Sequence, residues 1–134
     1  MIVIDSSIFA AAILPDESCS LADDIIQKII NREIQAYVPP LFYVEITNTF
    51  LMAFRRKRIT EKNLLNCIKV LPEFFFTVDT NGNLQRKTEL AIEHNLTIYD
   101  ATFIELAERR SIPLATLDKA LQKAGTKMNL IYAL

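Results

Sequence analysis

The chain opens with Met1-Ile2-Val3-Ile4-Asp5-Ser6-Ser7, in which three β-branched apolar residues are followed abruptly by an acid and two hydroxyls. Such a run is typical of a buried β-strand. Strands of a parallel sheet are covered on both faces, so their side chains need not alternate in polarity, and the first polar residue marks the carboxyl end. The stretch therefore predicts a buried strand over residues 2–5 that ends at Asp5.

Beyond this strand, segments with the hydrophobic period of a helix alternate with short runs typical of strands. We expect strands over residues 2–5, 35–38, 75–78, 97–99, 114–115 and 129–132. We expect helices over residues 7–13, 18–32, 40–56, 60–71, 81–94, 100–110 and 118–124, the last of them ended by Gly125. This alternation predicts an α/β fold of three layers, with helices on both faces of a central parallel sheet. No linker or repeat interrupts residues 1–134, so a single domain is expected.

The composition argues against membrane and secreted classes of protein. Hydrophobic residues make up 51% of the 134 residues, yet the apolar run from Ile8 to Pro15 is too short to cross a bilayer. Met1 leads directly into a strand instead of a basic signal region. Cys19 and Cys67 lack metal-ligand spacing and do not form the pattern of a disulfide scaffold. We therefore expect a soluble cytoplasmic protein with no membrane partner.

A second acid, Glu45, lies inside the apolar helix expected over residues 40–56. Apolar residues cover most of this helix, whereas Glu45, Asn48 and Met52 share one narrow stripe. A buried carboxylate without a partner would become neutral instead of keeping its charge. Glu45 is therefore expected to face a cation or an open cleft.

Two further acids follow expected strands. Asp100 stands where a strand-like stretch runs into a helix that it is expected to cap, and Asp118 opens the helix after residues 114–115. The carboxyl ends of parallel strands meet at one edge of a sheet, where ligands bind. Asp5, Asp100 and Asp118 are therefore expected to gather there, with Glu45 facing them. Asp79 also follows a strand-like run, but the turn Asn81-Gly82-Asn83 comes next, and we expect a structural role for it.

The residue types restrict the chemistry of this cluster. Carboxylate ligands select hard cations, Mg²⁺ or Mn²⁺, and a single histidine, His94, argues against zinc. Ser6 or Ser7 would have to share His94 in nucleophilic catalysis, and the chain has no Gly-x-Ser-x-Gly turn. The only glycines are Gly82 and Gly125, so no glycine-rich phosphate loop exists.

Basic residues are concentrated at two helix ends, although the formal net charge is −1. Arg55-Arg56-Lys57-Arg58 follows Glu45 on its helix, and Arg109-Arg110 closes the helix that begins at Asp100. Each run either complements the helix dipole or forms a track for phosphates. Glu105, about 140° around the helix from Asp100, is an outlying candidate for the site.

At these residues the chain resembles the PIN-domain ribonucleases, especially the toxin subunits of the virulence-associated class of bacterial and archaeal toxin–antitoxin pairs. Asp5-Ser6-Ser7 is similar to the family's first acidic motif, and Glu45 with Asn48 to its second. Tyr99-Asp100-Ala101 is similar to the third, and Thr116-Leu117-Asp118 to the Thr-x-Asp fourth. The resemblance extends over the whole length of the chain.

The resemblance implies RNA cleavage that depends on a divalent metal, Mg²⁺ or Mn²⁺, held by the acidic cluster. Asp5, Asp100 and Asp118 would bind the metal, and Glu45 would bind it or orient the attacking water. The residues expected to support these carboxylates are Ser6, Asn48 and Thr116, and those expected to bind RNA phosphates are Arg55, Arg56, Lys57 and Arg58. The resemblance also implies a homodimer and an antitoxin that blocks the site.

Two alternatives have different consequences. A catalytically inactive PIN-like domain would be a binding or assembly module whose acids only cap helices. An aspartyl-phosphate enzyme would need a second carboxylate two residues after Asp5, where Ser7 stands. The many aromatic residues, among them Phe42, Phe50 and Phe75, are expected to leave an exposed apolar surface that suits an interface.

Overall fold

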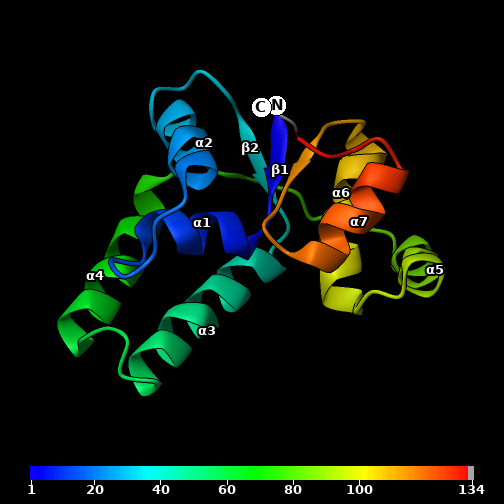
Figure 1. Cartoon of the computed structure of the whole chain (residues 1–134). Helices are drawn as coiled ribbons and strands as arrows, with labels where there is room; N and C mark the ends of the chain where they lie inside the picture. The colour runs from blue at the N-terminus through cyan, green and yellow to red at the C-terminus, as the bar shows by residue number, and fades with distance from the viewer. Residues whose placement is uncertain (133–134) are drawn as a thin grey trace.

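Four short parallel strands form the centre of the computed structural model, which describes residues 1–132 (Figure 1). They are β1 (Ile2–Ile4), β2 (Ala36–Val38), β3 (Thr77–Val78) and β4 (Leu114–Ala115), in the order β3-β2-β1-β4. The opening strand β1 is central, and Val3 pairs with Tyr37 of β2 on one side and with Leu114 of β4 on the other. The fully buried apolar run at the amino terminus thus occupies the middle of the sheet, as its composition predicts.

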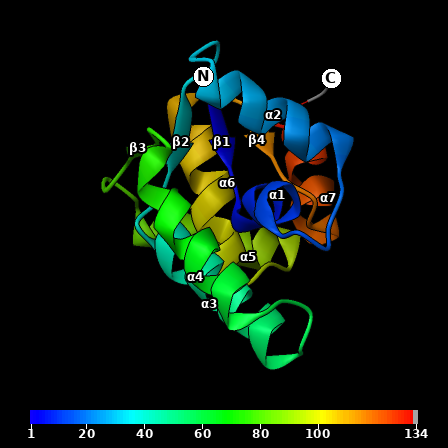
Figure 2. The ribbon, with the colours of Figure 1, turned by 90° about the vertical axis from the view of Figure 1, so that its left-hand side faces the viewer.

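Helices cover both faces of this sheet, which confirms the predicted α/β fold of three layers. On one face lie α1 (Ser6–Ile13), α2 (Ser20–Ile30), α3 (Leu41–Arg55) and α4 (Glu61–Val70), which a 3₁₀ turn at Leu71–Glu73 follows. On the other lie α5 (Leu84–His94), α6 (Ile98–Arg110) and α7 (Lys119–Lys127). Figure 2 looks onto the α1–α4 face, with α6 and α7 behind the strands. The carboxyl ends of the strands lie at the lower edge of the sheet in Figure 1.

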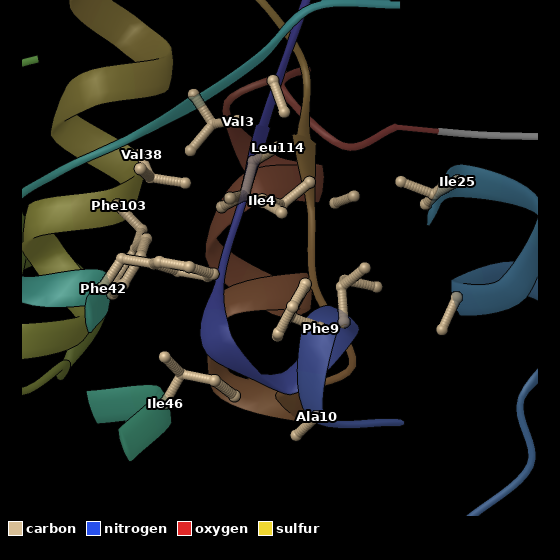
Figure 3. Close-up of a cluster of buried hydrophobic side chains, with 14 of the residues drawn as sticks. Val3, Ile4, Phe9, Ala10, Ile25, Val38, Phe42, Ile46, Phe103 and Leu114 are labelled. Carbon is tan, nitrogen blue, oxygen red and sulfur yellow. The ribbon is translucent and has the colours of Figure 1, made fainter. Parts of the chain in front are cut away.

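The core on the α1 side of the sheet is built around Phe9, a residue of α1 whose side chain is fully buried. Its ring packs edge-on against Phe42 at 5.9 Å and Phe74 at 4.8 Å between ring centroids, and it also contacts Phe50 and Phe76. Figure 3 shows Phe9 in this core with Ile4 of β1, Phe42 of α3 and Phe103 of α6. The packed core thus fixes the end of β1, where Asp5 follows, and the helices α3 and α6.

The strand expected over residues 97–99 is wrong, because α6 begins at Ile98. Thr97 caps this helix, and its Oγ1 accepts a hydrogen bond from the Asp100 amide at 3.1 Å. Asp100 therefore stands in the first helical turn and is not the cap that its position suggested. Local β propensity was overridden by a threonine with an acid three residues later, which is a helix-start pattern.

The end of the chain also differs from the prediction. Helix α7 continues through Gly125 to Lys127, and the turn comes at Asn129, whose φ is 55°. Gly125 is instead a packing position, since a Cβ there would lie 2.5 Å from Cδ1 of Ile131. The strand expected over residues 129–132 is reduced to one isolated bridge between Leu114 and Ile131.

The aromatic residues of α3 were wrongly expected at the surface. Phe42 and Phe50 are fully buried, and Tyr43 and Phe54 are partly covered by the core. On α3 the exposed large apolar side chain is Val44, and others on the rest of the described residues include Phe75, Leu84, Ile92 and Tyr99. No helix within residues 1–132 has both the length and the apolar character that a membrane crossing requires.

Candidate active site at the carboxyl edge of the sheet

Asp5 lies at the carboxyl end of β1, where it is buried and also caps α1. Its Oδ1 accepts hydrogen bonds from the amides of Ser7 and Ile8 and, at 2.5 Å, from the Ser7 hydroxyl. Its Oδ2 accepts one from Thr116 Oγ1 at 2.6 Å. These donors hold the carboxylate in a single orientation toward the sheet edge.

Thr116 connects Asp5 to Asp118. While its hydroxyl donates to Asp5, the same oxygen accepts the Asp118 amide at 3.0 Å. The Ser7 hydroxyl likewise accepts the Leu117 amide at 2.9 Å, so the loop after β4 is fastened to the start of α1. Asp118 caps α7 by accepting the Leu121 amide at 2.9 Å, and it lies exposed at the surface.

Glu45 and Asp100 approach this edge from two helices on opposite faces of the sheet. Ser6 Oγ donates to Oε2 of the half-buried Glu45 at 3.2 Å. The Thr97 hydroxyl donates to Oδ2 of Asp100 at 2.7 Å, which fixes that carboxylate at the start of α6. Hydroxyl side chains therefore orient three of the four acids.

The environment disfavours negative charge on two of the acids. Burial raises the pKa of Asp5, although the hydrogen bonds from Ser7, Thr116 and two amides oppose that effect. Burial also raises the pKa of Glu45; the charges of Asp100 and Asp5 raise it further, and the bond from Ser6 opposes them. The charges of Asp100 and Asp5 thus both act on Glu45, and a cation beside Glu45 would relieve that repulsion.

The donor atoms suit a hard divalent cation, since they are carboxylate oxygens held by hydroxyl groups. Within residues 1–132, however, no three Asp, Glu, His or Cys side chains converge closely enough in this conformation to hold one ion. Binding a metal would therefore require the acids to draw together. Glu45 is the acid on which the charges of both Asp100 and Asp5 already act.

A family model for the PIN domain matches residues 2–127 of the chain. The chain belongs to the PIN domain family. Ribonuclease VapC3 of Pyrobaculum aerophilum is 29% identical over 123 residues, which are 90% of this chain and 91% of that relative. The family resemblance drawn from the acidic motifs is confirmed.

Two solved structures share the fold of this PIN domain. PAE2754 from Pyrobaculum aerophilum superposes with a TM-score of 0.68 at 21% identity, covering 92% of this chain and 78% of that one. FitAcB from Neisseria gonorrhoeae superposes with a TM-score of 0.66 at 14% identity, covering 94% of each chain. The central parallel sheet and its helical layers are therefore shared across distant sequences.

The remaining predicted residues of the PIN domain site are less closely connected to the acids. Asn48 is exposed on α3, and within residues 1–132 its side chain donates no hydrogen bond to them. Arg58 folds back and forms ion pairs with Asp16 at 2.7 Å and Glu17 at 2.6 Å. The charge of Arg58 is therefore compensated by these two acids, whereas Arg55, Arg56 and Lys57 at the end of α3 are exposed cations.

The arginines that close α6 were expected to complement the helix dipole or to bind phosphates. In the structure they form ion pairs with buried acids. Arg109 donates from both terminal nitrogens to Asp79, at 3.1 and 3.2 Å, and from Nε to Glu105 at 2.9 Å. Arg110 also binds Asp79 and stacks over the ring of Tyr37. Asp79 is thus structural, as expected, and the buried Glu105 belongs to this network. The spacing of Glu105 and Arg109, four residues on a helix, was the sequence signal for that pair.

Asp79→Asn is expected to destabilise the fold by about 2 kcal/mol at pH 7. Burial acts to raise the pKa of Asp79, but the bonds from Arg109, the Asn81 amide and Arg110 prevail and lower it from 3.8 to about 2. The stabilisation is therefore complete above pH 4 and disappears as the pH falls through about 2. Urea unfolding of both proteins at pH 7 and near pH 2 measures this. An equal difference at both pH values would contradict the ionic origin.

Proposed function

We propose that this PIN domain is an endoribonuclease that depends on a divalent metal, Mg²⁺ or Mn²⁺, and that it is the toxin of a toxin–antitoxin pair. The observation that carries the proposal is that the half-buried Glu45 is held at 3.2 Å by Ser6, the neighbour of Asp5, while the charges of Asp100 and Asp5 both act on it. An arrangement that raises the pKa of its own carboxylates costs stability unless a cation or a reaction uses it. The ribonuclease name of the relative VapC3 supports the same assignment.

Asp5, Asp100 and Asp118 would hold the metal, which when bound lowers the pKa of water and stabilises charge on phosphoryl oxygens. Glu45 would orient the attacking water and accept its proton, because its raised pKa brings it closer to neutral pH than an ordinary glutamate. Ser6 and Thr116 would keep Glu45 and Asp5 in place through the hydrogen bonds already described. Asn48 would complete this support on α3 once RNA or metal draws the acids together.

Thr116→Val is expected to lower RNA cleavage by about 10- to 100-fold, and to lower the unfolding free energy by about 1–3 kcal/mol because the buried Asp5 oxygen loses its donor. The valine cannot donate to Asp5 or accept from the Asp118 amide, so two acids lose their positioning. Since the lost bond lowers the pKa of Asp5, that pKa rises further, and the acidic limb of the pH–rate profile moves to higher pH. Thr116→Ser restores the hydroxyl and should restore both rate and profile. A slower variant with an unmoved profile would mean that Thr116 does not act through Asp5.

Cleavage of a labelled single-stranded RNA by the purified chain tests the proposal directly. Activity is expected with Mg²⁺ or Mn²⁺, none with a chelator, and recovery when metal is restored. The competing assignment is a binding module, which the capping roles of Asp5 and Asp118 favour. A chain that binds Mn²⁺ weakly or not at all and leaves every RNA intact would establish that module instead.

The proposed partners are RNA, a second copy of the chain and an antitoxin. Arg55, Arg56 and Lys57 offer positive charge to RNA phosphates at the end of α3. Val44 and Tyr99, next in sequence to Glu45 and Asp100, are 69% and 61% exposed and offer apolar surface beside the acids. An antitoxin that places an arginine among the acids would replace the cation and stop the enzyme.

Light scattering and co-expression test these partners separately. A dimer is expected at tens of micromolar, and growth arrest on expression should be relieved by the cognate antitoxin. A chain that stays monomeric and does not arrest growth would contradict both the homodimer and the antitoxin as partners. The cleavage assay would still decide whether the chain is a ribonuclease.

A further inference from the structure

A cavity of about 240 Å³ lies on the β2–β3 side of the sheet edge, beyond the acids of the proposed site. Its lining comes from the start of α3, the loop after β3, α5 and α6, and includes Leu41, Gly82, Lys87, Thr102, Glu105 and Arg109. Its volume is many times the roughly 15 Å³ that a single water requires. The cavity therefore has room for a molecular group larger than solvent.

Glu105 gives this cavity an unused hydrogen-bond acceptor. The residue is 1% exposed, and its Oε1 accepts the Asn83 amide at 3.2 Å and Arg109 Nε at 2.9 Å. Its Oε2 is buried and has no hydrogen-bond donor within residues 1–132. Leaving a buried carboxylate oxygen unpaired is costly, so such an atom points to a missing partner.

Gly82 lets the end of a lysine side chain lie near this oxygen. A Cβ at Gly82 would lie 3.7 Å from Glu105 Oε2 and 2.5 Å from Lys87 Nζ. The glycine has no positive φ, so its backbone does not require glycine. The missing side chain therefore lets the end of Lys87, a donor, lie against Gly82 on the side of the acceptor Glu105.

We propose that this cavity binds one unpaired base of the RNA that the domain cleaves. The edge of a base carries N–H donors beside carbonyl or ring-nitrogen acceptors, so it can donate to Glu105 and accept from Lys87 together. The charged residues that line the cavity balance, with two acids and two bases: Asp79, Glu105, Lys87 and Arg109. A neutral base suits that balance, whereas an arginine or lysine of a partner would meet two cations.

The cavity is placed to receive a nucleotide next to the cleavage point. Leu41 precedes Glu45 by about one turn of α3, and Thr102 follows Asp100 by two residues on α6. Helices α3 and α6 therefore carry two of the proposed acids, Glu45 and Asp100, and also part of the cavity wall. The inference rests on the proposed ribonuclease function, because it assigns the cavity to that substrate.

The test measures RNA binding without cleavage, using the full chain carrying Asp100→Asn in the presence of a chelator. An abasic nucleotide is moved through each position of an eight-nucleotide single-stranded RNA. Loss of the bound base is expected to weaken binding about tenfold at one position, a typical effect for one recognised base. Adding Gly82→Ala should remove that sensitivity, because the methyl group takes the place of the Lys87 ammonium beside Glu105 and displaces it.

Two further variants separate a filled cavity from a damaged fold. Glu105→Gln changes the acceptor but also loosens Arg109, so Gly82→Ala, which leaves Glu105 intact, decides the result. Gly125→Ala, at the only other glycine, should leave the abasic profile unchanged. A flat profile in the parent protein, or an unchanged profile after Gly82→Ala, would overturn the proposal. A flat profile together with NMR shifts at the cavity on adding N-acetylglutaminamide would assign it to a peptide.

The proposed function and this inference fail in different ways. Cleavage by the unaltered chain with a flat abasic profile would reject the base pocket and keep the ribonuclease. A position-specific abasic effect without any metal-dependent cleavage would reject the ribonuclease and keep an RNA-binding pocket.

Discussion

Replacing Asp100 by asparagine is expected to lower metal-dependent RNA cleavage at least about 1000-fold while the domain stays folded. Asparagine keeps the oxygen that accepts the Thr97 hydroxyl, so the first turn of α6 is retained. It removes the charge that would hold the cation, and metal stabilisation of a reacting phosphate is worth several kcal/mol, which corresponds to about three orders of magnitude in rate. Single-turnover cleavage at saturating Mn²⁺ measures the effect.

The stability of this variant separates catalysis from folding. Without metal, the unfolding free energy should change by less than about 1 kcal/mol, because the lost interaction with the helix dipole is offset by relief of repulsion with Glu45. Asp23→Asn, at an exposed acid in the first turn of α2, is the matched control and should cleave normally. Full activity of Asp100→Asn would remove Asp100 from the site.

Phe9→Ala is expected to destabilise the domain by about 3–5 kcal/mol, the range for removing a fully buried phenylalanine. The ring contacts four other aromatic rings, from α3 and from the segment before β3, so its removal leaves a cavity that several elements would have to fill. Urea unfolding monitored by circular dichroism measures the loss. Because α1 begins directly after Asp5, cleavage at temperatures near the new midpoint should fall in parallel with the folded fraction.

Phe75→Ala is the control for that substitution. Phe75 is 75% exposed, and the Arg32 guanidinium lies over its ring, 5.1 Å from the ring centroid. Its removal should change the unfolding free energy by less than about 1 kcal/mol. Comparable losses from the two substitutions would mean that the Phe9 cluster does not dominate the core.

The sequence was most informative where one physical requirement acted alone. The opening run Ile2–Ile4 had no polar residue to offer solvent, so it had to be buried in a sheet, and Asp5 had to mark its end. Glu45 stood out for the reverse reason, as a charge on an apolar helix. Both inferences needed only the local sequence, and the structure places these two acids at the same edge.

Inference from the sequence failed where two local preferences competed. Thr97, Ile98 and Tyr99 favour a strand by composition, but Thr97 with Asp100 also starts a helix, and tertiary packing decided in favour of the helix. In α6 every residue from Ala101 to Ala107 is buried, so no periodic pattern could show that Glu105 faces inward. Burial on all sides is a property of the assembled domain.

The central position of β1 makes the proposed site depend on contacts between distant parts of the sequence. Val3 pairs with Leu114, and Asp5 is bound by Thr116, which follows it by 111 residues. A partly folded state in which β1 pairs only with β2 therefore lacks both the second neighbour of that strand and the threonine that orients Asp5. The proposed nuclease becomes competent only when β4 has joined the sheet, so its activity is coupled to a contact between distant parts of the sequence.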